Sequence, residues 1–273
     1  MYQRISELLH AEGISLFAPI PLSACTIKKS YLLSREGITD GTAIMIAVPY
    51  YTEECEGATV SAYAVGRDYH AFFAGVFERI VPILKKEFPN NRFCGFADHS
   101  PISELHAAAA AGLGIIGKNS MLITEKYSSF VFLGELICDA HLDAEAKPIR
   151  TCENCGACVA ACPAKNGREC LSAVTQKKGE LTPSQIAYIR EYGSAWGCDI
   201  CQNVCPHTKR AKKSGDIYTD IPFFRDSAIS SPSVSDIQDM SDLEFNGRAY
   251  SWRGRDCILR NLSLIGENKN KQR

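Results

Sequence analysis

The chain has 273 residues, of which 45% are apolar and 22% charged, and its net charge is −1. This balance is typical of a globular protein with a sizeable core, and a net charge near zero gives no overall attraction to nucleic acid or to a membrane surface. No apolar run is long enough for a membrane span, and Met1–Glu7 lacks the apolar core of a signal peptide. We therefore expect a cytoplasmic protein, whose thirteen cysteines are metal ligands or free thiols rather than disulfides.

The first part of the chain alternates predicted helices and strands. Ile5–Glu12 is expected to form a short amphipathic helix, and the apolar run Ala43–Pro49 a buried strand. Tyr69–Phe88 is expected to be helical, because six apolar residues are spaced to form one buried stripe: Phe72, Phe73, Val76, Ile80, Ile83 and Leu84.

A third predicted helix, Leu105–Ala111, is rich in alanine and ends at Gly112. Met121–Ile123 and Phe130–Ile137 follow as predicted strands, which we expect to pair in a hairpin. The alternation of strands and helices up to about residue 145 indicates an α/β or α+β domain.

The composition changes after Lys147–Pro148, where the cysteines begin to cluster. We predict three parts: a first domain over residues 1–147, a cysteine-rich domain over 148–215 and a helical tail over 216–273. Within the tail, Val234–Arg273 is expected to be helical, with an apolar stripe formed by Leu259, Leu262 and Ile265.

The firmest motif is a ferredoxin-type cysteine run. Four cysteines separated by two, two and three residues precede a proline: Cys152, Cys155, Cys158 and Cys162. In bacterial ferredoxins, the first three ligands of such a run bind one 4Fe–4S cluster and the fourth binds the other cluster. A second group, Cys198, Cys201 and Cys205, lacks one cysteine of a full run, and Cys170 can supply it.

This spacing predicts two four-cysteine ligand sets. Cluster one is assigned to Cys152, Cys155, Cys158 and Cys205, and cluster two to Cys162, Cys170, Cys198 and Cys201. Structural zinc is the alternative, because it is often bound by two C-x-x-C pairs. A third cysteine that follows at the same three-residue step and the two Cys-Pro endings favour iron–sulfur clusters. The remaining cysteines are expected to be small buried residues or surface thiols: Cys25, Cys55, Cys94, Cys138 and Cys257.

A glycine-rich segment, Gly112–Gly117, matches the dinucleotide fingerprint G-x-G-x-x-G. It follows a predicted helix, whereas the fingerprint follows a strand and opens a helix, so NAD or FAD binding is disfavoured. Glycines at this spacing do permit the backbone to approach a flat, bulky ligand closely.

Five segments occur in an order that resembles a known family: Tyr63–His70, Asp98–Glu104, Ala111–Asn119, Phe132–Leu136 and Gly197–Pro206. With the cysteine pattern, they resemble the epoxyqueuosine reductases, cobalamin-dependent iron–sulfur enzymes related to reductive dehalogenases. The resemblance covers roughly residues 40–265. It implies an α+β fold, in which a nitroreductase-like α/β domain that binds base-off cobalamin precedes a two-cluster ferredoxin-like domain and a short helical tail.

The family resemblance also implies a reaction, the reduction of epoxyqueuosine to queuosine in tRNA, with an external low-potential electron donor. Removal of the epoxide oxygen as water requires two electrons and two protons. The clusters supply electrons singly, and cobalt in its lowest oxidation state is a strong nucleophile or reductant toward the carbon of the C–O bond.

Asp98 corresponds to the family's catalytic aspartate, and burial beside the corrin would raise its pKa so that it can donate a proton. Without the family context, a turn or N-cap residue before Pro101 is the favoured interpretation of Asp98, and the resemblance reverses this preference. The implied cobalamin contacts are Tyr63, His70, Gly112, Gly114, Gly117, Lys118 and Asn119. A core tyrosine, a histidine at a helix start and a solvated turn are the alternatives for Tyr63, His70 and Lys118–Asn119.

The chain departs from the family pattern in several places. Leu105 stands where an arginine is usual, and the chain stops soon after Asn261, where full-length members continue into helical repeats that grip tRNA. His141 is assigned no cobalt-ligand role, because Ala144 replaces the glycine of the D-x-H-x-x-G motif.

These departures keep two other functions open. One is a related corrinoid reductase, similar to reductive dehalogenases, that acts on a small molecule. The other is a non-catalytic iron–sulfur electron carrier. Basic residues that could contact tRNA phosphates flank the cysteines or lie near the C-terminus: Lys177, Lys178, Lys209, Arg210, Lys212, Lys213, Arg248, Arg253, Arg255 and Arg260.

Overall fold

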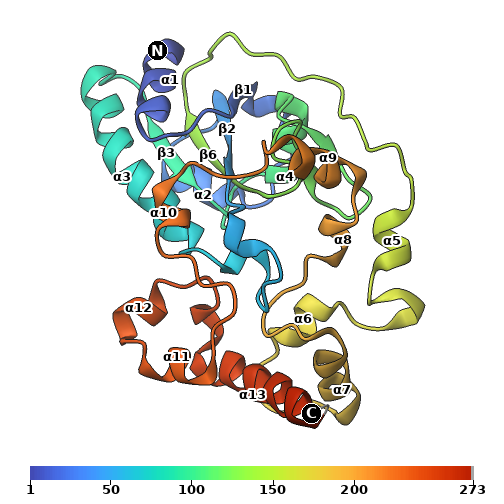
Figure 1. The fold of residues 1–273 in the computed structure, drawn as a ribbon. Helices are drawn as coiled ribbons and strands as arrows, with labels where there is room; N and C mark the ends of the chain where they lie inside the picture. The colour runs from blue at the N-terminus through green and yellow to red at the C-terminus, as the bar shows by residue number, and fades with distance from the viewer. Residues whose placement is uncertain (272–273) are drawn as a thin grey trace. The chain divides into compact units, whose positions relative to one another are not determined.

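Figure 1 shows the computed structural model, which describes residues 1–271. The chain forms two compact units, each assembled from separate stretches. The first unit comprises Met1–Pro49, Tyr69–Cys155 and Ala211–Asp220, and the second comprises Tyr50–Asp68, Gly156–Arg210 and Ile221–Arg273. The three-domain division at residues 147 and 215 stays a prediction.

The elements of the first unit are α1 (Tyr2–Ala11), β1 (Phe17–Pro21), the 3₁₀ turn η1 (Leu22–Ala24), α2 (Ser30–Arg35), β2 (Thr42–Pro49), α3 (Tyr69–Glu87), β3 (Phe93–Phe96), α4 (Glu104–Ala111), β4 (Ile115–Ile116), β5 (Leu122–Ile123) and β6 (Val131–Cys138). The second unit contains η2 (Glu53–Cys55), η3 (Ala62–Ala64), α5 (Ala157–Ala161), η4 (Lys165–Gly167), α6 (Leu171–Thr175), α7 (Pro183–Tyr192), α8 (Ile200–Asn203), α10 (Pro222–Arg225), α11 (Val234–Asp239), α12 (Asp242–Asn246), η5 (Ser251–Arg253) and α13 (Arg255–Lys271). Helix α9 (Pro206–Ser214) begins in residues of the second unit and ends in residues of the first.

The first unit is built on a four-stranded sheet with the order β1-β2-β6-β3, in which every pairing is antiparallel. Ile44 of the fully buried strand β2 lies opposite Leu136 of β6. The α/β interpretation of this part of the chain is therefore wrong, and the unit is α+β. A strand that is covered on both faces is a continuous apolar run whether its neighbours are parallel or antiparallel. The sequence of Ala43–Pro49 therefore could not reveal the direction of pairing.

The predicted hairpin between Met121–Ile123 and Phe130–Ile137 is also wrong. Strand β5 pairs with β4, whereas β6 lies between β2 and β3. The ladder between β2 and β6 joins eight residue pairs from Thr42↔Cys138 to Pro49↔Val131. Pairing with the two-residue strand β5 would leave most of the backbone groups of β6 without a ladder partner, which is costly inside a core.

Helices α3 and α4 cover opposite faces of the sheet (Figure 1), and successive residues of β6 point to these faces in turn. Gly134 faces α3, because a Cβ there would lie 2.6 Å from the ring of Phe73. Glu135 faces the other way, toward the apolar cluster that contains Ile137 and the alanines of α4. The direction of each side chain on β6 thus decides which helix it meets.

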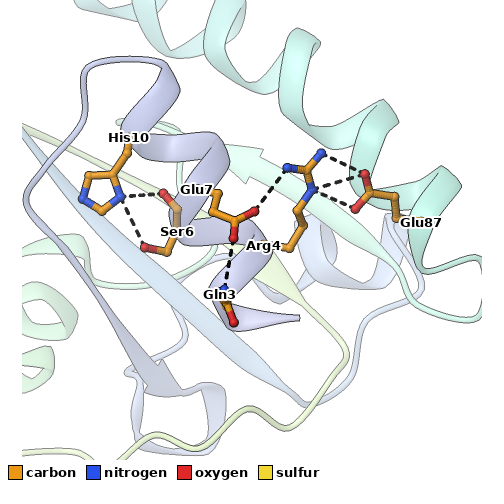
Figure 2. A network of polar contacts seen from close by, with 6 residues as sticks. All are labelled: Gln3, Arg4, Ser6, Glu7, His10 and Glu87. Carbon is orange, nitrogen blue, oxygen red and sulfur yellow. Dashed lines mark hydrogen bonds and ion pairs between the residues drawn. The ribbon is translucent and has the colours of Figure 1, made fainter.

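Helix α1 buries Ile5, Leu8 and Leu9, as predicted, and an ion pair at the edge of this stripe joins it to α3. Arg4 donates from Nε to Glu87 Oε2 and from Nη2 to Glu87 Oε1, both at 2.9 Å (Figure 2). Both side chains are more than one-third exposed, so this pair orients α1 rather than stabilising it strongly.

The apolar stripe predicted on α3 is confirmed at five of its six positions: Phe72, Phe73, Val76, Ile80 and Leu84. Ile83 is the exception, because its side chain is 37% exposed. It lies three residues after Ile80, at the edge of the stripe, while Leu84 completes the next turn toward the sheet.

The second unit has its own core, in which α13 packs against α6, α7 and α11. Trp196 and Tyr250 are fully buried there, and their rings meet edge to face at 6.2 Å between centroids. Leu262 and Ile265 are buried as predicted, and Leu259 is half-buried.

Val234–Arg273 is not one helix, which corrects the prediction for this segment. It forms α11, α12 and α13, with residues 272–273 outside the described residues. Ser233 and Ser241 each accept a hydrogen bond from the backbone N–H three residues later, and these capping boxes start new helices. Among the described residues, no helix combines the length and the apolar composition needed to cross a bilayer.

We predict that Gly134→Ala destabilises the first unit by about 1–3 kcal/mol, because the added methyl group would overlap the Phe73 ring. Urea unfolding measures this change. Gly75→Ala on α3 is the matched control, since its added Cβ meets only the flexible end of Arg79, at 3.1 Å. Equal loss of stability in both variants would contradict the packing that we describe.

Candidate functional site

Asp98 lies in the loop between β3 and α4, beside the first turn of α3. Its Oδ2 is 3.6 Å from Nε2 of His70, and its backbone N–H donates to Oε1 of Glu104 at 3.1 Å. Its φ of 62° is in the left-handed region, which aspartate tolerates better than most residues. The side chain is 69% exposed, so the first unit does not itself provide the burial that we expect for a proton donor.

Two further carboxyl groups lie directly behind this loop. Burial raises the pKa of Glu104 to about 7. Burial first, and then the charge of Glu104, raise the pKa of Glu135 well above its ordinary value. The hydroxyl of Ser100 donates to Oε1 of Glu135 and accepts from the N–H of Ile102 at 3.0 Å.

Neither glutamate is among the site residues predicted from the sequence. Both lie in segments that carry the family resemblance, and Glu135 interrupts the otherwise apolar run Phe130–Ile137. A carboxylate inside a predicted buried strand is the signal that could have revealed it, because an isolated buried charge is costly.

A pocket open to solvent adjoins the Asp98 loop. Its cavity volume is about 280 Å³, and α2, α3, β3 and the residues that follow β3 line it, with His70 and His99 among the polar residues and Phe73, Phe77 and Phe96 among the apolar ones. Tyr31 Oη lies 3.2 Å from Nε2 of His99. His70 and Asp98 are thus brought together, and a ligand in this pocket would meet His70 directly.

Tyr63 belongs to the second unit, whereas His70 and Asp98 belong to the first. Its hydroxyl accepts a hydrogen bond from Nε1 of the buried Trp196 at 2.7 Å, and burial raises its pKa. This contact agrees with the alternative of a core tyrosine, and the predicted role in cobalamin binding stays untested.

The glycine-rich segment follows α4 and opens no helix, so its context is not that of a dinucleotide site. Gly112 ends α4 with φ of 91°. Gly114 passes close to β5, since a Cβ there would lie 2.4 Å from the carbonyl oxygen of Ile123. After Gly117, Oδ1 of Asn119 is buried and has no hydrogen-bond partner among the described residues.

This segment also anchors the first predicted cluster cysteine. Ile116 donates from its N–H to Arg150 O at 2.9 Å and accepts from the N–H of Cys152 at 3.0 Å. The backbone N–H of Lys118 lies 3.4 Å from the sulfur of Cys152 and donates to it. Hydrogen bonds to cysteine sulfur are one means by which proteins set the potential of an iron–sulfur cluster.

The donor set suits iron–sulfur ligation, because all eight predicted ligand cysteines are free thiols and none is fully buried. In the second unit, α5, which carries Cys158, packs against α8, which carries Cys201. The pKa of Cys198 is raised to about 11, chiefly by burial, and the charge of Cys170 is among the smaller causes. Cys170 therefore lies near Cys198, a member of the set to which it is assigned, although among the described residues no three His, Cys, Asp or Glu side chains are close enough to hold a metal ion.

The five cysteines outside the motif divide into two classes. Cys94, Cys138 and Cys257 are buried, as the prediction of small buried residues requires. Cys25 and Cys55 are half-buried, and burial raises the pKa of each. A raised pKa keeps these thiols protonated and unreactive.

Most of the arginines near the C-terminus already bind backbone carbonyls. Arg248 donates to Ser227 O, Arg255 donates to Ile237 O and Met240 O, and Arg260 donates to Lys177 O and Gly179 O. Arg253 instead stacks on the exposed ring of Trp252, with its guanidinium 3.7 Å from the centroid. Leu105, in place of the family's arginine, packs against the cluster beneath α4.

Comparison with known proteins gives consistent matches. A family model described as "Epoxyqueuosine reductase QueG, DUF1730" matches residues 39–99, which include Asp98. An epoxyqueuosine reductase of Gloeobacter violaceus is 33% identical over 217 residues, 75% of this chain and 68% of that protein.

Two solved structures share the fold at 23% identity. The epoxyqueuosine reductase of Streptococcus thermophilus has a TM-score of 0.74 and matches 98% of this chain and 81% of that one. A crystal structure of an epoxyqueuosine reductase with an epoxyqueuosine-modified tRNA-Tyr stem loop has a TM-score of 0.71 and matches 97% and 81%. The extent and identity of the sequence match decide the classification: this chain belongs to the epoxyqueuosine reductase family, a family of oxidoreductases.

Proposed function

We propose that the chain reduces epoxyqueuosine to queuosine in tRNA, using cobalamin and two 4Fe–4S clusters. The observation that carries the proposal is the Asp98 loop, in which an accessible carboxyl lies beside His70, a residue that lines a pocket, and within the segment that the family model matches. An accessible acid next to a ligand-sized pocket is what protonation of a departing oxygen requires.

The proposed reaction converts the epoxide to an alkene and water with two electrons and two protons. The clusters would supply the electrons one at a time, and cobalamin would supply a low-potential cobalt centre at the carbon of the C–O bond. Asp98 would give one proton to the departing oxygen and become a carboxylate. His70, with Nε2 3.6 Å from that carboxylate, would hold it in place as the charge develops.

The cofactors would be held by the residues that the sequence predicts. Cluster one would be bound by Cys152, Cys155, Cys158 and Cys205, and cluster two by Cys162, Cys170, Cys198 and Cys201. Cobalamin would be held by Tyr63, His70, Gly112, Gly114, Gly117, Lys118 and Asn119. The buried, unpartnered Oδ1 of Asn119 supports the last contact, because it offers an acceptor to an amide of the corrin.

The tRNA would be the macromolecular partner, and an external low-potential donor would reduce the clusters, so the proposal places the enzyme in the cytoplasm. Arg248, Arg255 and Arg260 are expected to contribute little to phosphate binding, because backbone carbonyls occupy their guanidinium groups. That occupancy also favours a second candidate, reduction of a small-molecule epoxide or halide by the same cofactors.

We predict that Asp98→Asn abolishes epoxyqueuosine reduction and leaves both clusters in place. Asparagine tolerates the left-handed backbone at this position but cannot donate the proton. The assay measures queuosine in tRNA by mass spectrometry, with the exposed Asp143→Asn as the control. Full activity of Asp98→Asn would remove Asp98 as the donor, and an inactive wild-type holoenzyme would contradict the proposed function.

We predict that Cys170→Ser removes one of the two clusters, because Cys170 completes the second ligand set. Iron and sulfide per chain should fall by about half, and the electron paramagnetic resonance signal of one cluster should disappear. Cys94→Ala, at a buried cysteine outside the motif, should keep both clusters. Unchanged iron content in Cys170→Ser would show that another residue is the ligand.

A further inference from the structure

The two glutamates behind Asp98 have no role in the reaction as proposed so far, although their burial has a clear cost. Glu135 stands on the central strand β6, with Oε1 bound by Ser100. Its Oε2 is buried, and no donor among the described residues reaches it. A buried carboxylate oxygen without a donor is strongly disfavoured.

A proton on Glu104 would remove this deficit. Glu104 starts α4, the helix packed on the face of the sheet to which Glu135 points, and the two carboxyl groups lie close enough for each to shift the pKa of the other. Oε1 of Glu104 at the same time accepts the Asp98 N–H at 3.1 Å. One carboxyl therefore contacts both the buried glutamate and the loop of the proton donor.

We propose that Glu104 and Glu135 share one proton, and that this pair holds the Asp98 loop in place and returns a proton to Asp98 after each turnover. The inference rests on the proposed function for its second half only. In the first step, Asp98 gives its proton to the departing oxygen. In the second, the shared proton passes to the Asp98 carboxylate, and the doubly ionised pair then takes one proton from water.

The surrounding charges are consistent with this role. The groups that act on Glu104 are Asp98 from the preceding loop, Glu135 from β6 and His70 from α3. Burial and the negative charge of Asp98 raise the pKa of Glu104 and so favour retention of its proton, whereas the Asp98 N–H, the contact with Glu135 and His70 lower it. Cys25 and Cys94 also respond to the charge of Glu135, and their raised pKa values keep both thiols neutral.

The variant Glu104→Gln distinguishes two possible roles of Glu104, supplying a proton to Asp98 and only holding its loop in place. Glutamine keeps an oxygen that accepts the Asp98 N–H but has no carboxyl proton to transfer. With pre-reduced holoenzyme, we expect a single turnover near the wild-type rate, and a steady-state rate lower by about tenfold or more, within the usual range for acid–base groups. Glu104→Ala also loses the acceptor and should be slow in both regimes. The exposed Glu145→Gln is the control.

Equal losses in single turnover and in steady state for Glu104→Gln would overturn the proposal, as would full activity of this variant in both regimes. Asp98→Asn should be inactive in both.

A second measurement needs no substrate. The infrared spectrum of the resting holoenzyme near neutral pH should contain the C=O band of a protonated carboxyl, and its frequency should change in both Glu104→Gln and Glu135→Gln, because each variant alters the partner of the shared proton. If the band is unchanged in either variant, the shared proton is excluded. If the band behaves as expected but the wild type reduces no epoxyqueuosine, the shared proton stands and the proposed function fails.

The pH dependence of folding provides an independent test. Burial raises the pKa of Glu104 from 4.5 to about 7, so the folded chain keeps a proton that the unfolded chain has released between these values. Stability should therefore fall as the pH rises through this window and reach its lower level above pH 7. Glu104→Gln should flatten this part of the curve, and a curve parallel to that of the wild type would contradict the shared proton.

Discussion

The eight-residue ladder between β2 and β6 is the constraint on which the candidate site depends. It sets the register of β6, and so it decides that Gly134 faces α3 and that Glu135 faces α4. The ring of Phe73 packs closely against Gly134, and this contact brings α3, with His70 in its first turn, against the sheet. Glu135, on the other face, lies beneath Glu104. Two adjacent residues of one strand thus organise both sides of the Asp98 loop.

The Asp98 loop and the strand behind it combine several unfavourable features. Asp98 has a positive φ, Glu135 on β6 is a buried acid, and the hydroxyl of Ser100 donates its hydrogen to that acid. Packing alone would favour an apolar residue at each buried position. The surrounding core, built from the alanines of α4 and the apolar residues of β2, provides the stability that lets these features persist.

The second unit shows how the cysteine segment is held. Asp199, between Cys198 and Cys201, accepts hydrogen bonds from Ser61 Oγ at 2.5 Å and from the Ala62 N–H at 2.6 Å. These bonds join the cysteine loop to a stretch that lies more than 130 residues earlier in the chain. Arg248, Arg255 and Arg260 act in the same unit as donors to backbone carbonyls. Charged residues here hold the fold together, so their number is a poor guide to an RNA-binding surface.

The sequence by itself determined the features that depend on local spacing. These are the cysteine motif, the burial of Ile5 and Leu8 on α1 and most of the α3 stripe, because helical periodicity and motif spacing are properties of neighbouring residues. Asp98 became a candidate acid only through the family resemblance. Only the tertiary structure decided the antiparallel order of the sheet, the pairing of β5 with β4 and the meeting of Glu104 with Glu135. Each of these depends on contacts between residues far apart in the chain, and an apolar run such as Ala43–Pro49 is equally compatible with several partners.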